Sequence, residues 1–456
     1  MLSGCGPPAA APPESRERRI GIVRNPANRP IESRNGQGFA FTFRALGSRN
    51  FRLFYAGQSI SLIGTWMQQV AMIWLVYRLT HSAFLLGVVG FAGQIPTFLL
   101  APFTGVLADR WNRHRTLVVT QTLALLQAST LAILVLTGTA EVWHLVVLAV
   151  ALGTINALDM PTRQSFIVQM IERKEDLGNA IALNSAMVTA TRLLGPSIAG
   201  VLIGAFGEGI CFLANAISYV AVIAALLAMR VAPPPARPAN GRIIDGLREG
   251  FGYVAGLAPV RDTLLLLGFV SFMGMPYYIL LPVFAKDVLG GGAHTLGFLM
   301  GAAGLGSLVG TGFLAARRSV RGSGAIIAAG ATVFGVGLIA FSLSHIVWLS
   351  MLLICVAGLG MMVQMACSNT LIQTVVDDDK RGRVMSLFTM AFIGMAPFGS
   401  LFSGACASRI GAPGTLAIGG ALCIAGGIVF ASRLKTMRKS LHPIYRKMGI
   451  MPDLPS

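Results

Sequence analysis

Long apolar runs make up most of the chain, and they restrict its fold more than any other feature. A helical run of about 20 apolar residues spans the hydrocarbon core of a bilayer, because a helix satisfies its own backbone groups. Twelve such runs follow one another between residues 52 and 433. The sequence therefore predicts an all-α membrane protein with twelve transmembrane helices. The expected spans are residues 52–77, 84–108, 116–137, 143–162, 178–204, 210–230, 262–286, 295–315, 324–344, 347–374, 384–408 and 413–433.

The charged residues agree with this prediction. They make up only 12% of the chain, whereas a soluble domain has about 25%. A net charge of +18 could suit a nucleic-acid-binding protein, but the basic residues alternate with the apolar runs. Lys and Arg accumulate in cytoplasmic loops, and only Arg78, Lys286 and Arg409 fall in the loops on the other side. Both termini are therefore predicted to be cytoplasmic, and the expected partner is a lipid bilayer rather than nucleic acid.

Breaks in the apolar pattern divide the chain. Three consecutive prolines, residues 233–235, stop helix formation after the sixth span. The segment IIDGLREGFGYV that follows has apolar residues at helical spacing and is expected to form an amphipathic helix on the inner membrane surface. The predicted parts are a disordered cytoplasmic tail (1–45), an N-terminal six-helix bundle (46–230), a cytoplasmic linker (231–259), a C-terminal six-helix bundle (260–434) and a basic cytoplasmic tail (435–456).

An internal repeat indicates that the two bundles are similar. The segment GVLADR, residues 105–110, has a counterpart in GFLAAR, residues 312–317, and Pro196 has one in Pro397 at nearly the same offset. Two halves related by duplication are typical of secondary transporters, which bind substrate between the halves near the middle of the membrane.

The segment GVLADRWNRHR, residues 105–115, lies between the second and third spans and is the most specific motif. It resembles the signature G-x-x-x-D-R-x-G-R-R of the major facilitator superfamily. It matches at Gly105, Asp109, Arg110 and Arg113 and departs at Asn112 and His114, where the family has Gly and a basic residue. The resemblance implies the major facilitator fold.

The same resemblance implies that this loop latches the two halves together, against the helix that begins near Arg383. A helix N-terminus would stabilise the Asp109 carboxylate, and an acid such as Asp159, near Arg163, would pair with Arg113. The simpler alternative is a basic cytoplasmic loop in which Asp109 only caps a helix.

The fifth predicted span carries a second motif, RLLGPSIAG. It resembles the Gly-Pro motif of exporters at Gly195, Pro196 and Gly200, which implies a seal between the halves; an ordinary kinked membrane helix is the alternative. Arg192 is the one basic residue well inside a span. Its charge is costly there, so it could bind an anionic substrate, take part in proton coupling or brace backbone carbonyls.

Further segments are similar to the enterobactin-exporter-like branch of the superfamily. They are DMPTRQSF (159–166), RGRVMSLF (381–388) and LPVFAKDVLG (281–290). The resemblance covers residues 43–434 and implies an exporter of siderophores or drugs in the bacterial plasma membrane. We expect a monomer without cofactor or metal.

Polar and aromatic residues within the spans predict the substrate cavity. Gln58, Ser61, Thr65 and Gln69 recur at helical spacing and share one face of the first span. Large apolar side chains would suit bulky organic cargo. The other candidates are Gln94, Asn156, Asn184, Tyr277, Tyr278, Gln364, Phe388 and Phe392.

The sequence gives less information about what drives transport. No Gly-Lys pair occurs, which excludes a phosphate-binding loop of the G-x-x-x-x-G-K type and argues against direct ATP drive. Protons are the expected coupling ion, although every carboxylate is expected at or near a helix end; Asp109 and Asp159 are the best candidates. The alternatives are an importer of a polar nutrient and a membrane sensor or scaffold. An enzyme is not expected, because no nucleophile elbow or metal-ligand cluster is found.

Overall fold

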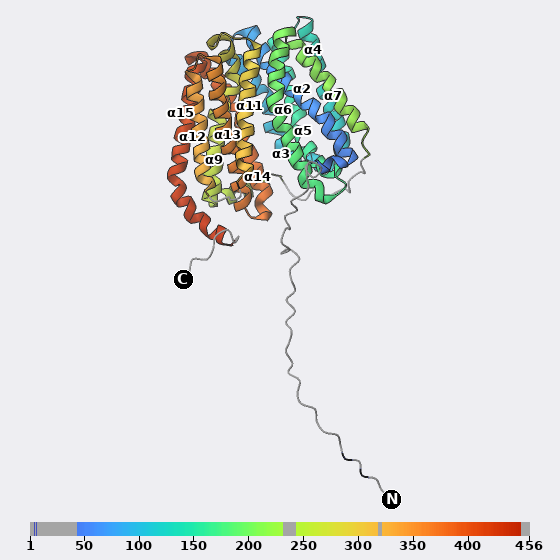
Figure 1. Ribbon diagram of the computed structural model, residues 1–456, viewed down its shortest axis with the longest axis vertical. Helices are drawn as coiled ribbons and strands as arrows, with labels where there is room; N and C mark the ends of the chain where they lie inside the picture. The colour runs from blue at the N-terminus through green and yellow to red at the C-terminus, as the bar shows by residue number, and fades with distance from the viewer. Residues whose placement is uncertain (1–3, 5, 7–42, 231–242, 318–321, 448–456) are drawn as a thin grey trace. The chain divides into compact units, whose positions relative to one another are not determined.

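The computed structural model describes residues 4, 6, 43–230, 243–317 and 322–447, and every regular element in these residues is helical. The predicted N-terminal tail lies largely outside the described residues, as do residues 231–242 of the predicted linker and residues 448–456 of the predicted C-terminal tail. From residue 43 onward, the described residues form a bundle of long helices (Figure 1).

Six long helices form the first part of the bundle. Each corresponds to one predicted span, and Figure 1 shows them packed side by side. They are α2 (Arg49–Thr80), α3 (Ala83–Arg110), α4 (Arg113–Leu136), α5 (Val142–Met170), α6 (Leu177–Phe206) and α7 (Glu208–Leu227), with short 3-10 turns at Arg44–Gly47 and Lys174–Asp176. We call the end of the bundle at which α2 begins the terminal face, and the end at which α2 stops the distal face.

The second part contains six further spans, two of them broken. The helices are α8 (Ile243–Gly256), α9 (Ala258–Met273), α10 (Tyr277–Val283), a π-helical turn (Phe284–Val288), α11 (Ala293–Ala315), α12 (Ser323–Ser342), α13 (Val347–Val375), α14 (Asp378–Phe392) and α15 (Ala396–Lys447). The seventh span is α9 followed by α10, and the eleventh is α14 followed by the start of α15. Gly411, at φ 77°, then turns the chain within α15 and begins the twelfth span.

The described residues contain eleven helices long and apolar enough to cross a membrane, the last of which runs over 59 residues from Asp379 to Met437. That last stretch includes the turn at Gly411 and holds two spans, so the predicted fold of twelve spans is confirmed. The fourth span is longer than predicted, because α5 continues through Pro161 to Met170.

The helices pack in two groups. In the first, α2 packs against α6 and α7, α3 against α5, and α4 against α5 and α7. In the second, α13 packs against α11 and α12, and α15 against α9 and α12. The main contacts between the groups are α3 with α15 and α6 with α11.

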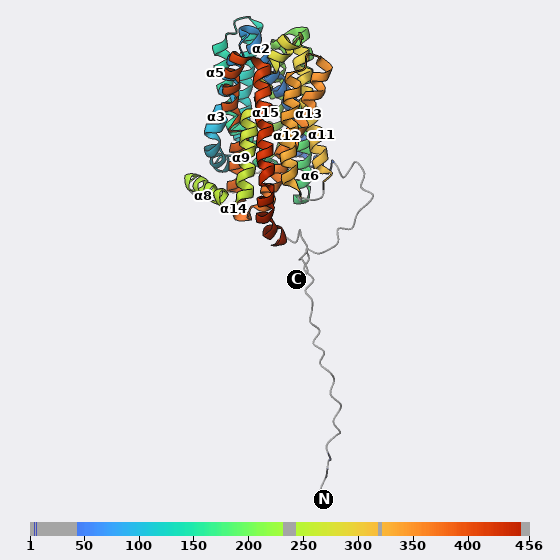
Figure 2. The same cartoon turned by 90° about the vertical axis from the view of Figure 1, so that its left-hand side faces the viewer.

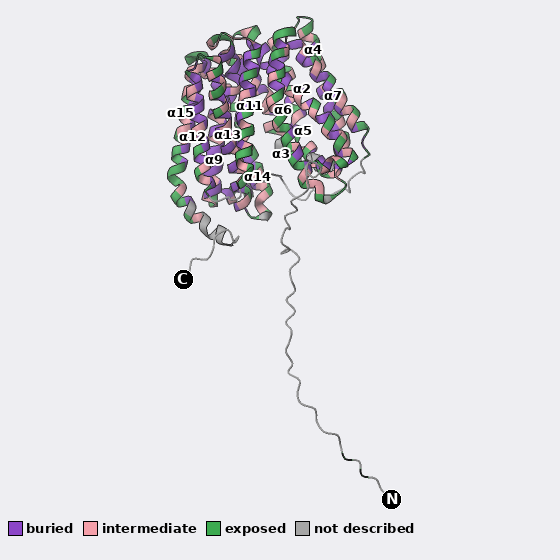
Figure 3. Ribbon diagram, in the orientation of Figure 1, coloured by how far each residue is buried: buried purple, intermediate pink, exposed green. Residues whose placement is uncertain are grey.

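The outer surface of the bundle is apolar, as a lipid-facing surface requires. Buried residues gather on the inner faces of the helices and exposed ones on the outside (Figure 3). Leu99, Ile133 and Ile428 are among the exposed aliphatic side chains. Trp143 and Trp348 are 59% and 67% exposed at the distal ends of α5 and α13, where tryptophans mark the interface between membrane and water.

The predicted amphipathic helix is α8, which lies across the terminal ends of α9 and α14 (Figure 2). Glu249 on α8 forms an ion pair with Lys380 and a second with Arg383 at 2.5 Å, both on α14. The hydrogen bond from Lys380 lowers the pKa of Glu249. Tyr253 donates a hydrogen bond to the Asp377 carboxylate at 3.0 Å. These contacts hold α8 against the second group of helices; the predicted domain boundaries themselves stay predictions.

Candidate functional site: the central cavity

A cavity of about 440 Å³ lies between the two groups of helices. Side chains of α2, α3, α5 and α6 form one wall, and those of α10, α13, α14 and α15 form the other. Seven of the predicted cavity residues line it: Thr65, Gln69, Gln94, Asn156, Tyr277, Tyr278 and Phe392. The wall is mainly apolar, and it includes Trp66 and Met72, which no polar or motif pattern in the sequence indicated.

The other five predicted cavity residues do not line this cavity. Gln58 and Ser61 are buried nearer the terminal end of α2, where the polar face of that helix packs against its neighbours. Gln364 is buried where α13 crosses α12 at Gly330. Helical spacing alone could not separate a face that contacts a neighbouring helix from one that faces the cavity. The remaining two, Asn184 and Phe388, also lie outside the cavity wall.

Each of the two interrupted spans lines the cavity at the point where its helix is interrupted. The chain leaves α9 at Gly274 and re-enters a helix at Tyr277, and the cavity residues Met275, Tyr277 and Tyr278 lie at this break. Phe392 and Ala396 flank the break between α14 and α15 and also line the cavity. Interrupted helices expose backbone and side chains to a central site in secondary transporters.

Arg192 brings a positive charge to the wall of this cavity. The centre of its guanidinium lies 5.5 Å from the Trp66 ring, in the geometry of a cation–π contact. Both residues line the cavity, and Arg192 is the only charged side chain among the described residues of its wall. No described acid forms an ion pair with it.

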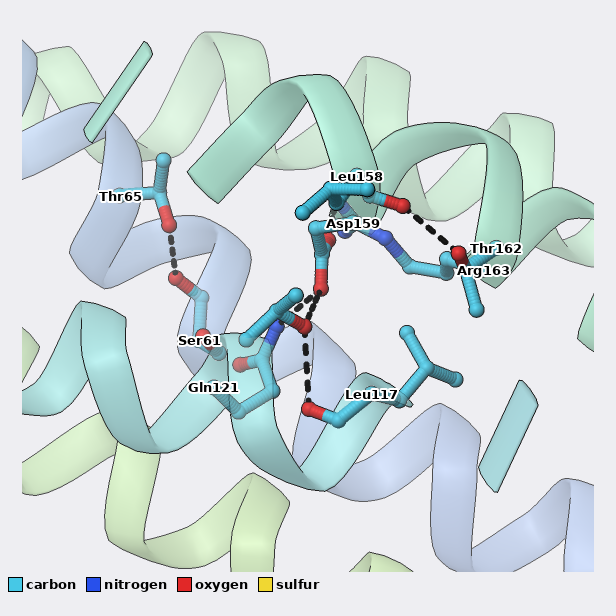
Figure 4. Close-up of polar contacts among 9 residues, drawn as sticks. Ser61, Thr65, Leu117, Gln121, Leu158, Asp159, Thr162 and Arg163 are labelled. Atoms are coloured by element: carbon cyan, nitrogen blue, oxygen red, sulfur yellow. Dashed lines mark hydrogen bonds and ion pairs between the residues drawn. The ribbon is translucent and has the colours of Figure 1, made fainter. Parts of the chain in front are cut away.

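The predicted latch acid, Asp159, is buried inside the first group of helices (Figure 4). It accepts hydrogen bonds from the Thr120 hydroxyl at 2.9 Å and the Gln121 amide at 2.8 Å, and pairs with Arg163 at 2.7 Å. One expectation changes: Asp159 lies within α5 rather than at its end, because α5 continues past it. Its described ion pair is with Arg163, and the expected pairing with Arg113 stays a prediction.

The structure describes only part of the predicted latch loop. Gly105, Asp109 and Arg110 form the last turns of α3, but their side chains lie outside the described part of the structure. Asn112, where the signature has Gly, caps α4: its side chain accepts a hydrogen bond from the backbone N–H of Arg115 at 3.1 Å. Its φ of −67° requires no glycine. Arg113 follows at the start of α4 and is half-buried.

Glycines allow the two groups of helices to approach each other closely near the distal face. A Cβ atom on Gly200 would lie 2.9 Å from the Cα of Gly297, and one on Gly87 would lie 3.0 Å from the Cα of Gly404. Backbones therefore touch where α6 crosses α11 and where α3 crosses α15. In the predicted Gly-Pro motif, the Pro196 carbonyl also lies against Gly297, whereas Gly195 packs against Trp66 of its own group.

The structure also contains three polar contacts that the sequence did not predict. The Tyr77 hydroxyl donates a hydrogen bond to the Asp287 carboxylate, joining α2 to the second group at the distal face. Deeper in the first group, the Asn215 amide donates to Gln68 at 2.8 Å, and the Gln68 amide donates to Gln127 at 3.0 Å. The amide side chains of Asn215, Gln68 and Gln127 within apolar spans were the sequence signal that could have indicated these two hydrogen bonds.

Comparison with known proteins identifies the protein family to which this chain belongs. Residues 40–448 match the family model described as transmembrane secretion effector. The chain belongs to this family of major facilitator transporters. The predicted superfamily, and its branch of siderophore and drug exporters, are confirmed, and the chain is a multi-pass membrane transporter, not an enzyme.

Relatives of this transporter include proteins with named substrates. It is 27% identical over 390 residues to the staphyloferrin A transporter of Staphylococcus aureus, covering 84% of this chain and 96% of that protein. It is 24% identical over 390 residues to macrolide efflux protein A of Streptococcus pyogenes, covering 83% and 94%. A solved bacterial homologue of the human lysosomal transporter Spinster has the same fold, with a TM-score of 0.68 and 14% identity over 86% of this chain and 98% of that one.

Proposed function

We propose that this transporter exports small organic molecules, siderophores or amphipathic drugs, from the cytoplasm by alternating access. The observation that carries the proposal is the position of the central cavity: it lies between two helix groups whose distal parts meet at the glycine crossings. Its aromatic and methionine side chains suit bulky organic cargo. Relatives named as a siderophore transporter and a macrolide efflux protein support the same substrate range.

In this proposal the terminal face is cytoplasmic, in the plasma membrane of a bacterium. Basic residues favour this orientation: among the described residues, the distal ends of the helices carry only Arg78, Lys286 and Arg409, whereas the terminal ends carry many more, including Arg44, Arg163 and Arg383. The predicted latch residues Gly105, Asp109, Arg110, Arg113, Asp159 and Arg163 would hold the terminal ends of the two groups together when the cavity opens distally. The protein would act as a monomer.

Protons are the proposed coupling ion. Asp159 is the described carboxylate best placed for this role, because it is buried inside the first group of helices and forms an ion pair with Arg163. An importer of a polar nutrient is less favoured, because one arginine is the only charge on the described cavity wall.

Dye accumulation in cells that lack their main efflux pumps tests the proposal. Cells would carry the intact protein, Asp109→Asn or an empty vector, and would be loaded separately with cationic rhodamine 6G, neutral Nile red and anionic carboxyfluorescein. We expect the intact protein to lower the accumulation of at least one dye, and both Asp109→Asn and a protonophore to abolish the effect. Equal accumulation of all three dyes in every strain would argue against export.

A further inference from the structure

We propose that the central cavity selects amphipathic organic anions, with Arg192 binding the anionic group. This inference rests on the proposed function, because it names the charge class of the exported cargo. It uses the chemistry of the cavity wall alone and does not depend on the direction of transport.

The charge of the wall is the first step. Twenty-four described residues line the cavity, and they include no Asp, Glu, Lys or His beside the single Arg192. A positive charge without an acid near the middle of a membrane is unfavourable unless something compensates it. A cationic cargo would add a second positive charge to this site, whereas an anionic cargo would neutralise the first.

The contacts of Arg192 leave its donors available. Its side chain makes the cation–π contact with Trp66, and no described residue forms a hydrogen bond or an ion pair with its N–H groups. A guanidinium has five N–H donors, no acceptor, and keeps its proton in proteins. No described carbonyl accepts a hydrogen bond from Arg192, which weakens the bracing role, and a group that keeps its proton cannot carry one through the transport cycle. Anion binding is the role that remains.

A second donor lies on the facing wall. Tyr278 lines the cavity, and its hydroxyl is buried and has no hydrogen-bond partner among the described residues. A buried hydroxyl without a partner is costly, and a phenol can donate to a carboxylate. Arg192 belongs to the first group of helices and Tyr278 to the second, so one anionic group between them would join both groups.

The other side chains of the cavity wall indicate the chemistry of the rest of the cargo molecule, apart from its anionic group. Trp66, Met275 and Phe392 offer aromatic and flexible apolar surface, and Gln69, Gln94 and Asn156 offer amides. A molecule with a carboxylate at one end and an aromatic or aliphatic body with a few polar groups would use all of these. An inorganic anion would leave most of the wall unused.

Direct binding to the purified protein in detergent tests the inference. Carboxyfluorescein and rhodamine 6G share a xanthene ring system and differ in charge, and fluorescence anisotropy reports the binding of each. We expect carboxyfluorescein to bind at least about tenfold more tightly than rhodamine 6G. Arg192→Gln should weaken carboxyfluorescein binding by a similar factor without weakening rhodamine 6G, and Arg192→Glu should reverse the preference.

Arg409→Gln is the matched control, because Arg409 is exposed at the distal face and outside the cavity wall; it should bind both dyes like the intact protein. Equal losses for both dyes in Arg192→Gln, tighter binding of the cation by the intact protein, or binding of neither dye would overturn the inference. Rhodamine 6G export in cells, without carboxyfluorescein binding, would overturn it while leaving the proposed export function in place. Anion binding without export of any dye would count against export alone.

Discussion

Asp159 illustrates how much a single buried side chain contributes to the stability of the folded protein. Its carboxylate is 3% exposed and its partner Arg163 is 20% exposed, so neither is well hydrated in the folded protein. Removing one partner of a buried pair leaves an uncompensated charge and costs about 3 kcal/mol or more. We therefore expect Asp159→Ala to lower the thermal unfolding midpoint of the purified protein clearly. Thr120→Val, which removes one hydrogen bond from a neutral hydroxyl to Asp159, should lower the midpoint less.

The double variant distinguishes this pair from general disruption. Once Asp159 is absent, Arg163→Ala removes the charge left behind, so the double variant should lose less stability than the sum of the single variants. Arg173→Ala, at an exposed position on the same face, is a control for arginine removal. Additive losses from Asp159→Ala and Arg163→Ala would show that the two residues contribute separately.

Residue types within a span could be predicted from the sequence more easily than the directions in which they point. Arg192 stood out because charge is rare in apolar helices, and the structure places it in the cavity wall. Gln58 and Gln69 share a sequence pattern, yet only Gln69 lines the cavity. Which part of a helix face meets another helix depends on crossing points, and no local pattern specifies these.

At the scale of helices, the crossing of α6 and α11 depends on the absence of side chains. A Cβ atom on Gly200 would lie 2.9 Å from the Ala293 carbonyl oxygen, whereas one on Gly204, a turn further along α6, would have no atom within 4 Å. A larger residue at Gly200 should push the groups apart at the distal face. Gly200→Leu is therefore expected to favour a distally open state, and Gly204→Leu should have little effect.

Labelling of Gln69→Cys in a cysteine-free background measures this change, because Gln69 lines the cavity. With a membrane-impermeant thiol reagent applied from outside the cell, Gly200→Leu should raise the labelling rate several-fold. The prediction fails if Gly200→Leu and Gly204→Leu label equally at equal membrane levels.

The contact between α8 and α14 should depend on pH. The hydrogen bond from Lys380 lowers the pKa of Glu249 from its ordinary value of 4.5. A carboxyl whose pKa is lower in the folded state stabilises that state above its ordinary pKa and loses this effect as the pH falls through the lowered value. A spin label at the exposed Gly252 should therefore keep its mobility from pH 7 to 5 and become more mobile below pH 4.5.

Glu249→Gln removes the charge at every pH, so its label should be mobile even at neutral pH. Glu172→Gln, which neutralises an exposed acid elsewhere, should leave the profile unchanged. A mobility profile in Glu249→Gln that matches the intact protein would mean that the ion pairs do not hold α8.

Helix positions followed closely from hydropathy, since a bilayer demands long apolar helices. The ends of α2, α11 and α13 lie within a few residues of the predicted spans. The breaks at residues 274–276 and 393–395 could not be predicted in this way, because these positions are apolar like their surroundings. Both breaks lie in the second group, next to residues of the cavity wall.

For the whole molecule, the decisive feature is that two compact groups meet mainly at two helix crossings. The α3–α15 and α6–α11 crossings, with the Tyr77–Asp287 hydrogen bond, provide the described links toward the distal face. Groups joined in this way can rotate about the crossings as rigid bodies, which is how secondary transporters expose a central site to each side in turn. The duplication seen in the sequence predicted the two groups but not which ends touch.

A reversible link between Tyr77 and Asp287 tests this movement. In a cysteine-free background, Tyr77→Cys and Asp287→Cys would be joined by a short bifunctional thiol reagent that a reductant can release. If transport requires the distal ends to separate, the linked protein should lose nearly all export, and reduction should restore it. Each single cysteine treated with the same reagent should export like the untreated protein. Export that persists with both cysteines fully linked would mean that the cargo leaves by a route other than the distal opening between the two groups.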